Sequence, residues 1–438
     1  MSGLLTTLIG ILVVAAGVGL SIGVHELGHM IPAKLFGVRV NKYMIGLGPT
    51  LFSRTRGETE YGLKLLPLGG YCRMIGMVPP KPEGRVDPKG YLGEVIAQSR
   101  YDSVHEILPG EEYRAFYNLS APKKLLIMAG GILANLLLAL LFTTIAFLIP
   151  TSHATNQLAN VSQCLPTADG SACDPTLANA PAALAGLQPG DIVRSFGGVE
   201  TPDWAALSGA ISRAEPGVEI PVLVERAGQQ LTLALTPVMV ERPAGFDAQG
   251  EPIRNAEGNI VTMTGPFVGV GPEFALQRTP LSQVPNAFWQ LLRGTISAVV
   301  TFPVQVFRVA VSLFTGAPRA ADGVMSVVGI GRVAAEVAGT GMQVSDIAAT
   351  MISIIASLNM ALFAFNLIPL LPFDGGHVVN GIYEGAKRQI ARIRHQPLPG
   401  PADVARMLPV AYVVIPLLVI SFLVLILADV ISPISIFG

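Results

Sequence analysis

The chain has 438 residues, of which 51% are hydrophobic and only 13% are charged, and its mean hydropathy is +0.54. Soluble globular proteins carry about 25% charged residues, so this composition indicates a membrane protein. The formal net charge of −1 gives no basic excess that could neutralise phosphates, which argues against nucleic acid as a partner.

Four segments are long and apolar enough to cross a hydrocarbon core about 30 Å thick, which takes roughly 20 helical residues. They are residues 3–33, 125–149, 346–371 and 408–431. The first has no basic start, since its first lysine is Lys34, and no small-residue cleavage site. We therefore expect it to be a retained span rather than a secretory signal.

A fifth apolar stretch, Thr295–Leu313, is interrupted by Pro303, Gln305 and Arg308. The uncharged run between Arg293 and Arg308 is too short to cross comfortably, so we expect an amphipathic helix at the membrane interface. We therefore predict a polytopic α-helical membrane protein with four transmembrane regions, at residues 1–36, 123–150, 341–377 and 408–438. Two loops on one side comprise residues 37–122 and 378–407. An inserted region comprises residues 151–272, and an interfacial region comprises residues 273–340.

The distribution of lysine and arginine predicts the orientation in the lipid bilayer. Residues 34–124 hold 14 of these side chains and residues 375–407 hold 5, whereas the much longer segment 151–340 holds 10. Because basic loops stay in the cytoplasm, we expect the first and third connections to be cytoplasmic and the middle region to lie outside. Cys164 and Cys173 fall in that outward region, where a disulfide between them is plausible and two unpaired thiols are the alternative.

Two connecting regions carry signals of β-structure. Between the first two spans, turn glycines separate β-prone runs such as Tyr61–Leu66 and Tyr71–Ile75, which predicts hairpins. In the outward region, a helical stretch at Trp204–Arg213 precedes strands at Ile220–Glu225 and Leu231–Leu235, with a last strand at Phe267–Val270. These features predict a small α+β module, and the glycine turns before its first strand resemble those of a PDZ domain.

The most informative residues are His25-Glu26-Leu27-Gly28-His29, which lie inside the first apolar span. Positions i and i+4 share one face of a helix, so both imidazoles can bind one ion, and Glu26 lies close enough to act on a water beside that ion. Ionisable groups inside a span cost several kcal/mol unless they have partners, and a coordinated cation is a suitable partner. We therefore expect zinc, with His25 and His29 as ligands and Glu26 as the catalytic base.

Catalytic zinc usually has three protein ligands, so a third must come from elsewhere in the chain. The best candidate is Asp374, because prolines and glycines break the third span around it, and irregular backbone at membrane depth needs protein or a wet cavity around it. Asp374 could instead be an exposed helix cap. His377 is a rival or additional ligand, and we expect Asp429 to face water.

Two buried amides lie in apolar spans and need hydrogen-bond partners there. For Asn135 we favour a clamp between helices. Asn366 precedes the proline-broken stretch, where it could bind the substrate peptide or the transition-state oxygen. Small residues, including Gly28 on the first span and Gly130 and Gly131 on the second, predict close packing of the two helices.

Together these motifs resemble the site-2 family of intramembrane zinc proteases, in particular the bacterial branch that regulates sigma factors. The resemblance rests on five sequence features over most of the chain: His25–His29, Gly46–Pro49, Pro67–Tyr71, Gly130–Asn135 and Asn366–Gly376. It implies zinc bound by His25, His29 and Asp374, Glu26 as general base, and Asn366 as a substrate contact. It also implies a membrane-associated β-hairpin element and one extracytoplasmic PDZ domain.

The resemblance further implies cleavage of single-span transmembrane substrates, such as anti-sigma factors already shortened by another protease. Two other functions remain open at this stage. A membrane protein that stores or moves zinc would depend on the ligands but not on Glu26. A catalytically silent PDZ adaptor would keep its function after alanine substitution of both histidines.

Overall fold

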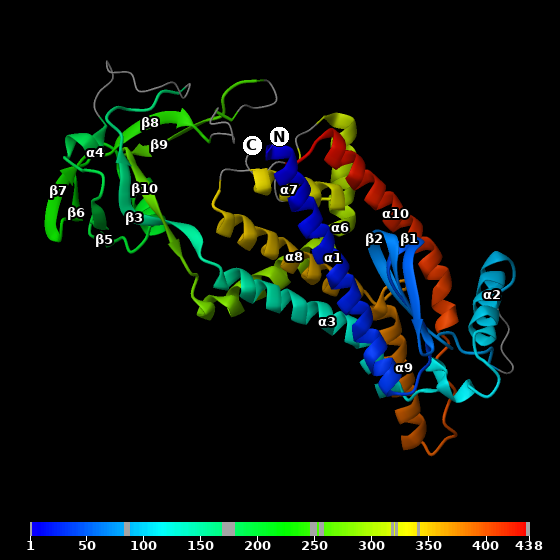
Figure 1. Ribbon diagram of the computed structural model, residues 1–438. Coiled ribbons are helices and arrows are strands. Elements are labelled where there is room, and N and C mark those ends of the chain that lie inside the picture. The colour runs from blue at the N-terminus through cyan, green and yellow to red at the C-terminus, as the bar shows by residue number, and fades with distance from the viewer. Residues whose placement is uncertain are drawn as a thin grey trace. The chain divides into compact units, whose positions relative to one another are not determined.

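A computed structural model describes residues 2–82, 88–168, 180–245, 252–253, 258–316, 319, 323–339 and 342–434 (Figure 1). The chain forms two compact units: one comprises residues 1–147, 280–339 and 347–434, and the other comprises 148–279, 340–346 and 435–438. Cys173 lies outside the described residues, so its pairing with Cys164 stays a prediction.

The first unit is mainly helical. Its longer elements are α1 (Ser2–Leu35), α2 (Tyr91–His105), α3 (Ala121–Leu148), α6 (Val284–Thr315), α7 (Val327–Gly339), α8 (Val344–Asn366), α9 (Asp374–Ile393) and α10 (Leu408–Ile431), and its strands are β1 (Val40–Arg56) and β2 (Thr59–Met74). Short 3-10 turns are η1 (Glu112–Arg114), η2 (Phe116–Asn118), η3 (Leu281–Gln283) and η4 (Val404–Met407).

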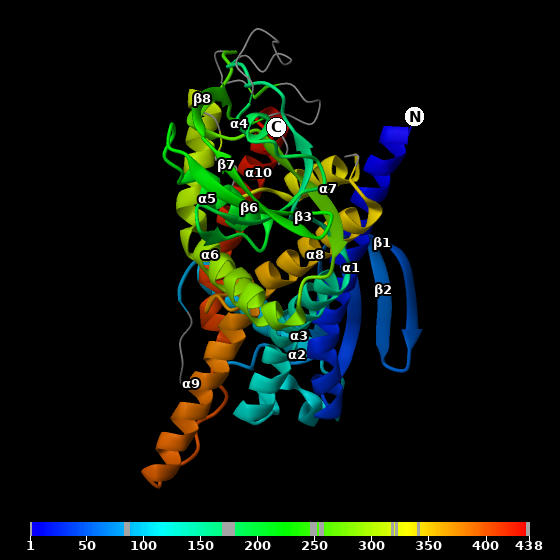
Figure 2. The same cartoon turned by 90° about the vertical axis from the view of Figure 1, so that its left-hand side faces the viewer.

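Helix α1 is the centre of this unit. One apolar cluster joins α1 to the hairpin and to α3 through Met30, Tyr43 and Ile127. A second cluster joins α3 to α8 through Ile132 and Met360. The hairpin lies alongside α1 in both views (Figure 2), so α1 is flanked by elements from three distant parts of the sequence.

The predicted hairpin region is one long antiparallel pair, β1 with β2, with several register shifts. The middle of β1 is paired on both edges, because Met44 lies opposite Tyr71 on one side and opposite Gly62 on the other. Gly70 lies against α1, where an added Cβ would be 2.7 Å from Ile22 Cγ2 and 3.2 Å from Glu26 Cγ. A glycine is therefore needed where β2 meets the helix that carries the histidines.

Five helices in the described part of the chain are long and apolar enough to cross a membrane: Ile9–Leu35, Ala121–Leu148, Leu281–Thr315, Val344–Asn366 and Val404–Ile431. We expected four. The additional candidate contains α6, the helix that we expected at the interface, and α6 continues through Pro303 to the C-cap Gly316. A proline removes one donor from the helical ladder, and the neighbouring turns still hold the helix together.

Two further differences concern the segment after α8. The third predicted region, 341–377, contains α8, which ends at Asn366, and the start of a separate helix, α9, at Asp374. The predicted loop 378–407 is largely helical, since α9 continues to Ile393. Good helix formers such as Glu384, Ala386 and Lys387 account for this, and the prolines at 397, 399 and 401 follow the end of the helix.

The second unit is a small α+β module. Its sheet has the antiparallel order β10-β3-β4-β6-β7, with β5 paired to β4, while β8 and β9 form a separate pair. The elements are β3 (Thr151–Val161), α4 (Pro181–Leu184), β4 (Ile192–Phe196), β5 (Val199–Glu200), α5 (Trp204–Ser212), β6 (Ile220–Arg226), β7 (Gln229–Leu235), β8 (Val238–Pro243), β9 (Thr262–Phe267) and β10 (Val270–Gln277).

The core of this module lies between α5 and the sheet, with Leu207, Val222 and Phe196 all buried. The predicted helix and the two strands after it correspond to α5, β6 and β7. The predicted strand Phe267–Val270 is wrong, because a turn with Gly269 at φ 87° separates β9 from β10 there.

Candidate metal centre

Helix α1 presents both histidines of the first motif on one face. The two Nε2 atoms lie 3.3 Å apart, and the two rings meet edge to face at 87°. His29 is buried, and the side chain of His25 is 12% exposed. This follows from the i, i+4 spacing on a helix, which places one imidazole above the other.

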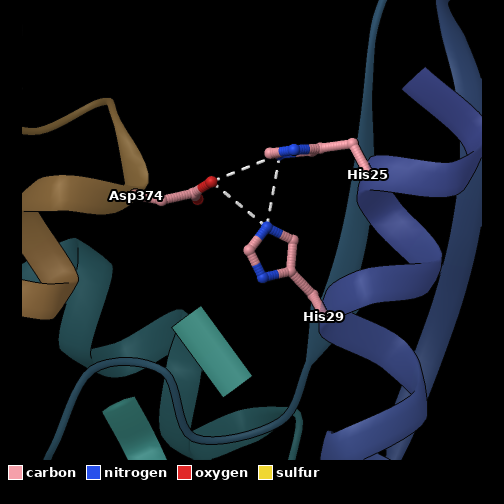
Figure 3. A group of neighbouring side chains, drawn as sticks. All are labelled: His25, His29 and Asp374. Atoms are coloured by element: carbon pink, nitrogen blue, oxygen red, sulfur yellow. Dashed lines mark hydrogen bonds and ion pairs between the residues drawn. The ribbon is translucent and has the colours of Figure 1, made fainter. Parts of the chain in front are cut away.

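The third residue, Asp374, reaches the same point from the start of α9. Its Oδ2 lies 3.2 Å from Nε2 of His25 and 3.2 Å from Nε2 of His29, and the three side chains point toward one another (Figure 3). Asp374 is the first residue of α9 and not an exposed cap at the end of α8. Among the described residues, these three form the single group of His, Cys, Asp or Glu side chains whose ligand atoms could hold one metal ion.

The separations between the ligand atoms fit a tetrahedral zinc site. Zinc bonds of about 2.0–2.1 Å at a tetrahedral angle place neighbouring ligand atoms roughly 3.3 Å apart. The three separations found here are 3.2, 3.2 and 3.3 Å. Two neutral imidazoles and one carboxylate are also a usual donor set for catalytic zinc, so the residues present fit this ion.

Glu26 lies next to this group without being part of it. Its side chain is buried, and β2 packs beside it, since a Cβ on Gly70 would lie 3.2 Å from Glu26 Cγ. The hairpin therefore holds Glu26 from the side opposite its own helix. A carboxylate fixed beside the ligand group, with no metal-ligating distance of its own, is placed to receive a proton.

Close packing of α3 on α1 shapes the site. A Cβ on Gly28 would lie 2.7 Å from the carbonyl carbon of Gly130, and a Cβ on Gly131 would overlap the imidazole of His29. This is the close approach that the small residues predict. The same helix holds both rings from behind, because the carbonyl of Ile127 lies 2.8 Å from His29 Nδ1 and the Asn135 amide lies 3.2 Å from His25 Nδ1.

The remaining predicted residues lie elsewhere. Asn366 is the last residue of α8 and is half-buried, so its contact with substrate stays a prediction. His377 is not a member of the ligand group and lines a separate cavity with Lys124 and Asn380. Our expectation that Asp429 faces water is wrong, since it is buried and pairs with Arg319 at 2.7 Å.

Sequence reasoning missed the partners in two buried polar contacts that other helices make with α1. Asn135 joins α3 to α1, as the clamp between helices that we favoured, but the sequence did not identify His25 as its partner. Asn359 on α8 is fully buried and donates to Ser21 Oγ on α1 at 2.8 Å, one turn before His25. An asparagine in an apolar span signals a polar partner, but the sequence does not say which partner.

Comparison with known proteins shows to which family the chain belongs. The model of peptidase family M50 matches residues 13–405. The chain is 28% identical to zinc metalloprotease Rip1 of Mycobacterium tuberculosis, with 98% of each chain covered. Rip1 of Mycolicibacterium smegmatis is also 28% identical, over 98% of this chain and 99% of that protein.

A more distant relative is zinc metalloprotease RasP of Shouchella clausii, which is 26% identical over 83% of this chain and 87% of its own length. The family model covers most of the chain, including α1 with both histidines and the start of α9 with Asp374. This chain therefore belongs to peptidase family M50.

Proposed function

We propose that this protein is an intramembrane zinc protease that hydrolyses a peptide bond within or near the transmembrane segment of a single-span protein. The observation that carries the proposal is the convergence of two histidines and one aspartate on a single point, with ligand-atom separations of 3.2–3.3 Å. Both histidines lie in an apolar candidate span, and Asp374 begins α9 eight residues after another such span ends at Asn366. The relatives named above are zinc metalloproteases, which supports zinc as the ion.

His25, His29 and Asp374 would hold the zinc, and when bound it supplies Lewis acidity, activating water and polarising the scissile carbonyl. Glu26 takes a proton from the attacking water and then delivers it to the leaving amine. Close packing of β2 at Gly70 limits the orientations open to the Glu26 side chain. Asn366 would bind the substrate backbone near the broken end of α8.

The substrate must present an extended backbone, because a helical peptide shields its carbonyls in its own hydrogen bonds. Helix-breaking residues in the substrate span should therefore favour cleavage. The resemblance to the branch that regulates sigma factors supports an anti-sigma factor as the substrate class. The second unit would act as a PDZ domain, which takes extended peptide ends by strand addition.

For the orientation we propose that α1, α3, α8 and α10 cross the membrane, with the basic segments 34–124 and 375–407 in the cytoplasm and the second unit outside. Helix α6 would lie at the interface. It is more amphipathic than α1, α3 or α10, and a full crossing by α6 would move residues 375–407 to the outside, against the distribution of lysine and arginine.

The test is Glu26→Gln in the full-length protein, co-expressed with candidate single-span anti-sigma factors. We expect zinc to remain bound and cleavage to fall by about 10²–10⁴-fold, which is the usual contribution of a general base. Glu94→Gln, at an exposed position of α2, is the matched control and should cleave normally. Normal cleavage by Glu26→Gln with zinc bound would contradict the role of Glu26 as the general base.

A further inference from the structure

The strongest unexplained feature beside the ligand group is the side chain of Asn135. It is 0% exposed, and its amide nitrogen Nδ2 faces His25 Nδ1 at 3.2 Å. Its oxygen Oδ1 is buried and has no hydrogen-bond partner in the described part of the protein. A buried amide oxygen without a donor costs about 1–3 kcal/mol, so this arrangement needs an explanation.

The other histidine provides the comparison. His29 Nδ1 lies 2.8 Å from the carbonyl oxygen of Ile127, and a carbonyl oxygen can only accept. The hydrogen of the neutral imidazole is therefore on Nδ1, which leaves the lone pair of Nε2 free to face Asp374 and His25. This is the tautomer that a metal bound through Nε2 requires.

His25 has the same requirement, because its Nε2 is also the atom that faces Asp374 and His29. With its hydrogen on Nδ1, His25 needs an acceptor, but an amide NH2 group can only donate. Two donors would then face each other at 3.2 Å, while the amide oxygen beside them has no donor. Rotating the amide by a half-turn removes both problems at once, and the two orientations have nearly the same shape.

We propose that Asn135 is a positioning residue for the zinc ligand His25, and that its Oδ1 accepts the Nδ1 hydrogen and fixes the tautomer that binds metal through Nε2. The inference rests on the proposed zinc function. In other metalloproteins, residues that accept the hydrogen of the second ring nitrogen orient the metal-ligating histidine, and their loss weakens metal affinity by about 10- to 100-fold.

The experiment measures zinc affinity of the full-length protein in detergent by chelator competition, with Co²⁺ absorption as a second readout. Asn135→Leu removes the acceptor at similar volume, and we expect about 10- to 100-fold weaker zinc binding. Asn135→Asp supplies an acceptor at the same place and should bind zinc as tightly as the wild type. Asn359→Leu is the matched control, because Asn359 is also 0% exposed on a neighbouring helix but bonds to Ser21; its zinc affinity should not change.

Wild-type zinc affinity in Asn135→Leu would overturn the inference. Equal loss of zinc affinity in Asn135→Asp and Asn135→Leu would also overturn it, because His25 would then need a donor and not an acceptor. A measurement on the zinc-loaded wild type does not depend on the folding of any variant. Imidazole ¹⁵N spectra should show the His25 hydrogen on Nδ1, and finding it on Nε2 would also overturn the inference. A wild-type protein that binds no zinc would refute the proposed function itself.

Discussion

Gly131→Ala should weaken zinc binding, because the added methyl group collides with a ligand. A Cβ at this position would overlap His29 Nε2 and lie 2.7 Å from Cε1 and 2.8 Å from Cδ2. Ordinary contacts begin near 3.4 Å, so the ring must move by about 0.6 Å or more, whereas metal-ligand distances tolerate about 0.2 Å. With zinc bound at Nε2 and the Nδ1 bond to Ile127 in place, the ring is held at two points and cannot turn away.

Overpacking of this kind costs about 1–3 kcal/mol. The strain is present only while His29 holds the ion, since the ring can turn aside once the metal leaves. At about 1.4 kcal/mol per tenfold, the dissociation constant for zinc should rise about 5- to 150-fold. Chelator competition on the purified protein measures this directly, and peptide cleavage at limiting zinc should fall in parallel.

Gly19→Ala is the control for the effect of alanine in a helix. Gly19 lies in α1, the helix that carries His25 and His29, and a Cβ there would meet nothing within 4 Å. Its zinc affinity should equal that of the wild type. If Gly131→Ala also binds zinc with wild-type affinity, then the position of His29, and with it our account of the site, is wrong.

Two predictions concern stability. In the second unit, burial of Asp191 acts to raise its pKa, but hydrogen bonds from Arg226 and the Gln188 N–H outweigh this and hold the pKa below its usual value. The contribution of this pair to the free energy of unfolding should be fully present above about pH 4 and should be lost as the pH falls through the folded pKa of Asp191. Hydrogen exchange of this unit should show this loss of stability at low pH in the wild type but not in Asp191→Asn. In the first unit, Lys124→Met removes the partner at 2.7 Å from buried Glu384, which keeps Arg388 at 3.0 Å and the backbone N–H of Ala402. The change should therefore cost about 1.5–3 kcal/mol, the usual contribution of a hydrogen bond to a charged group. Thermal unfolding measures this cost, and an unchanged melting temperature would contradict the pairing.

The sequence was most informative where ionisable groups occur in apolar segments. The sequence predicted that His25 and Asp374 share one ion, because each ionisable side chain needs a partner at membrane depth and few other partners are available there. The helical spacing fixes one half of the site. The two prolines between α8 and α9, with the two glycines in the first turn of α9, mark the other half.

Other features depend on partners far away in the chain, and no local pattern contains them. The carboxylate of Asp429 was expected to face water because it lies near the end of a span, yet Arg319 and the backbone N–H of Ser326 enclose it. The continuity of α6 through Pro303 likewise depends on the turns on both sides of the proline. Sequence patterns predict the environment of each residue from its neighbours in the chain, and tertiary packing can override that prediction.

The backbone contact between α1 and α3 restricts how a substrate can arrive. At Gly28 and Gly130 a single extra methyl group already collides with the facing helix, so an extended peptide is far too wide to pass there. A substrate that enters laterally from the lipid must therefore approach another side of α1.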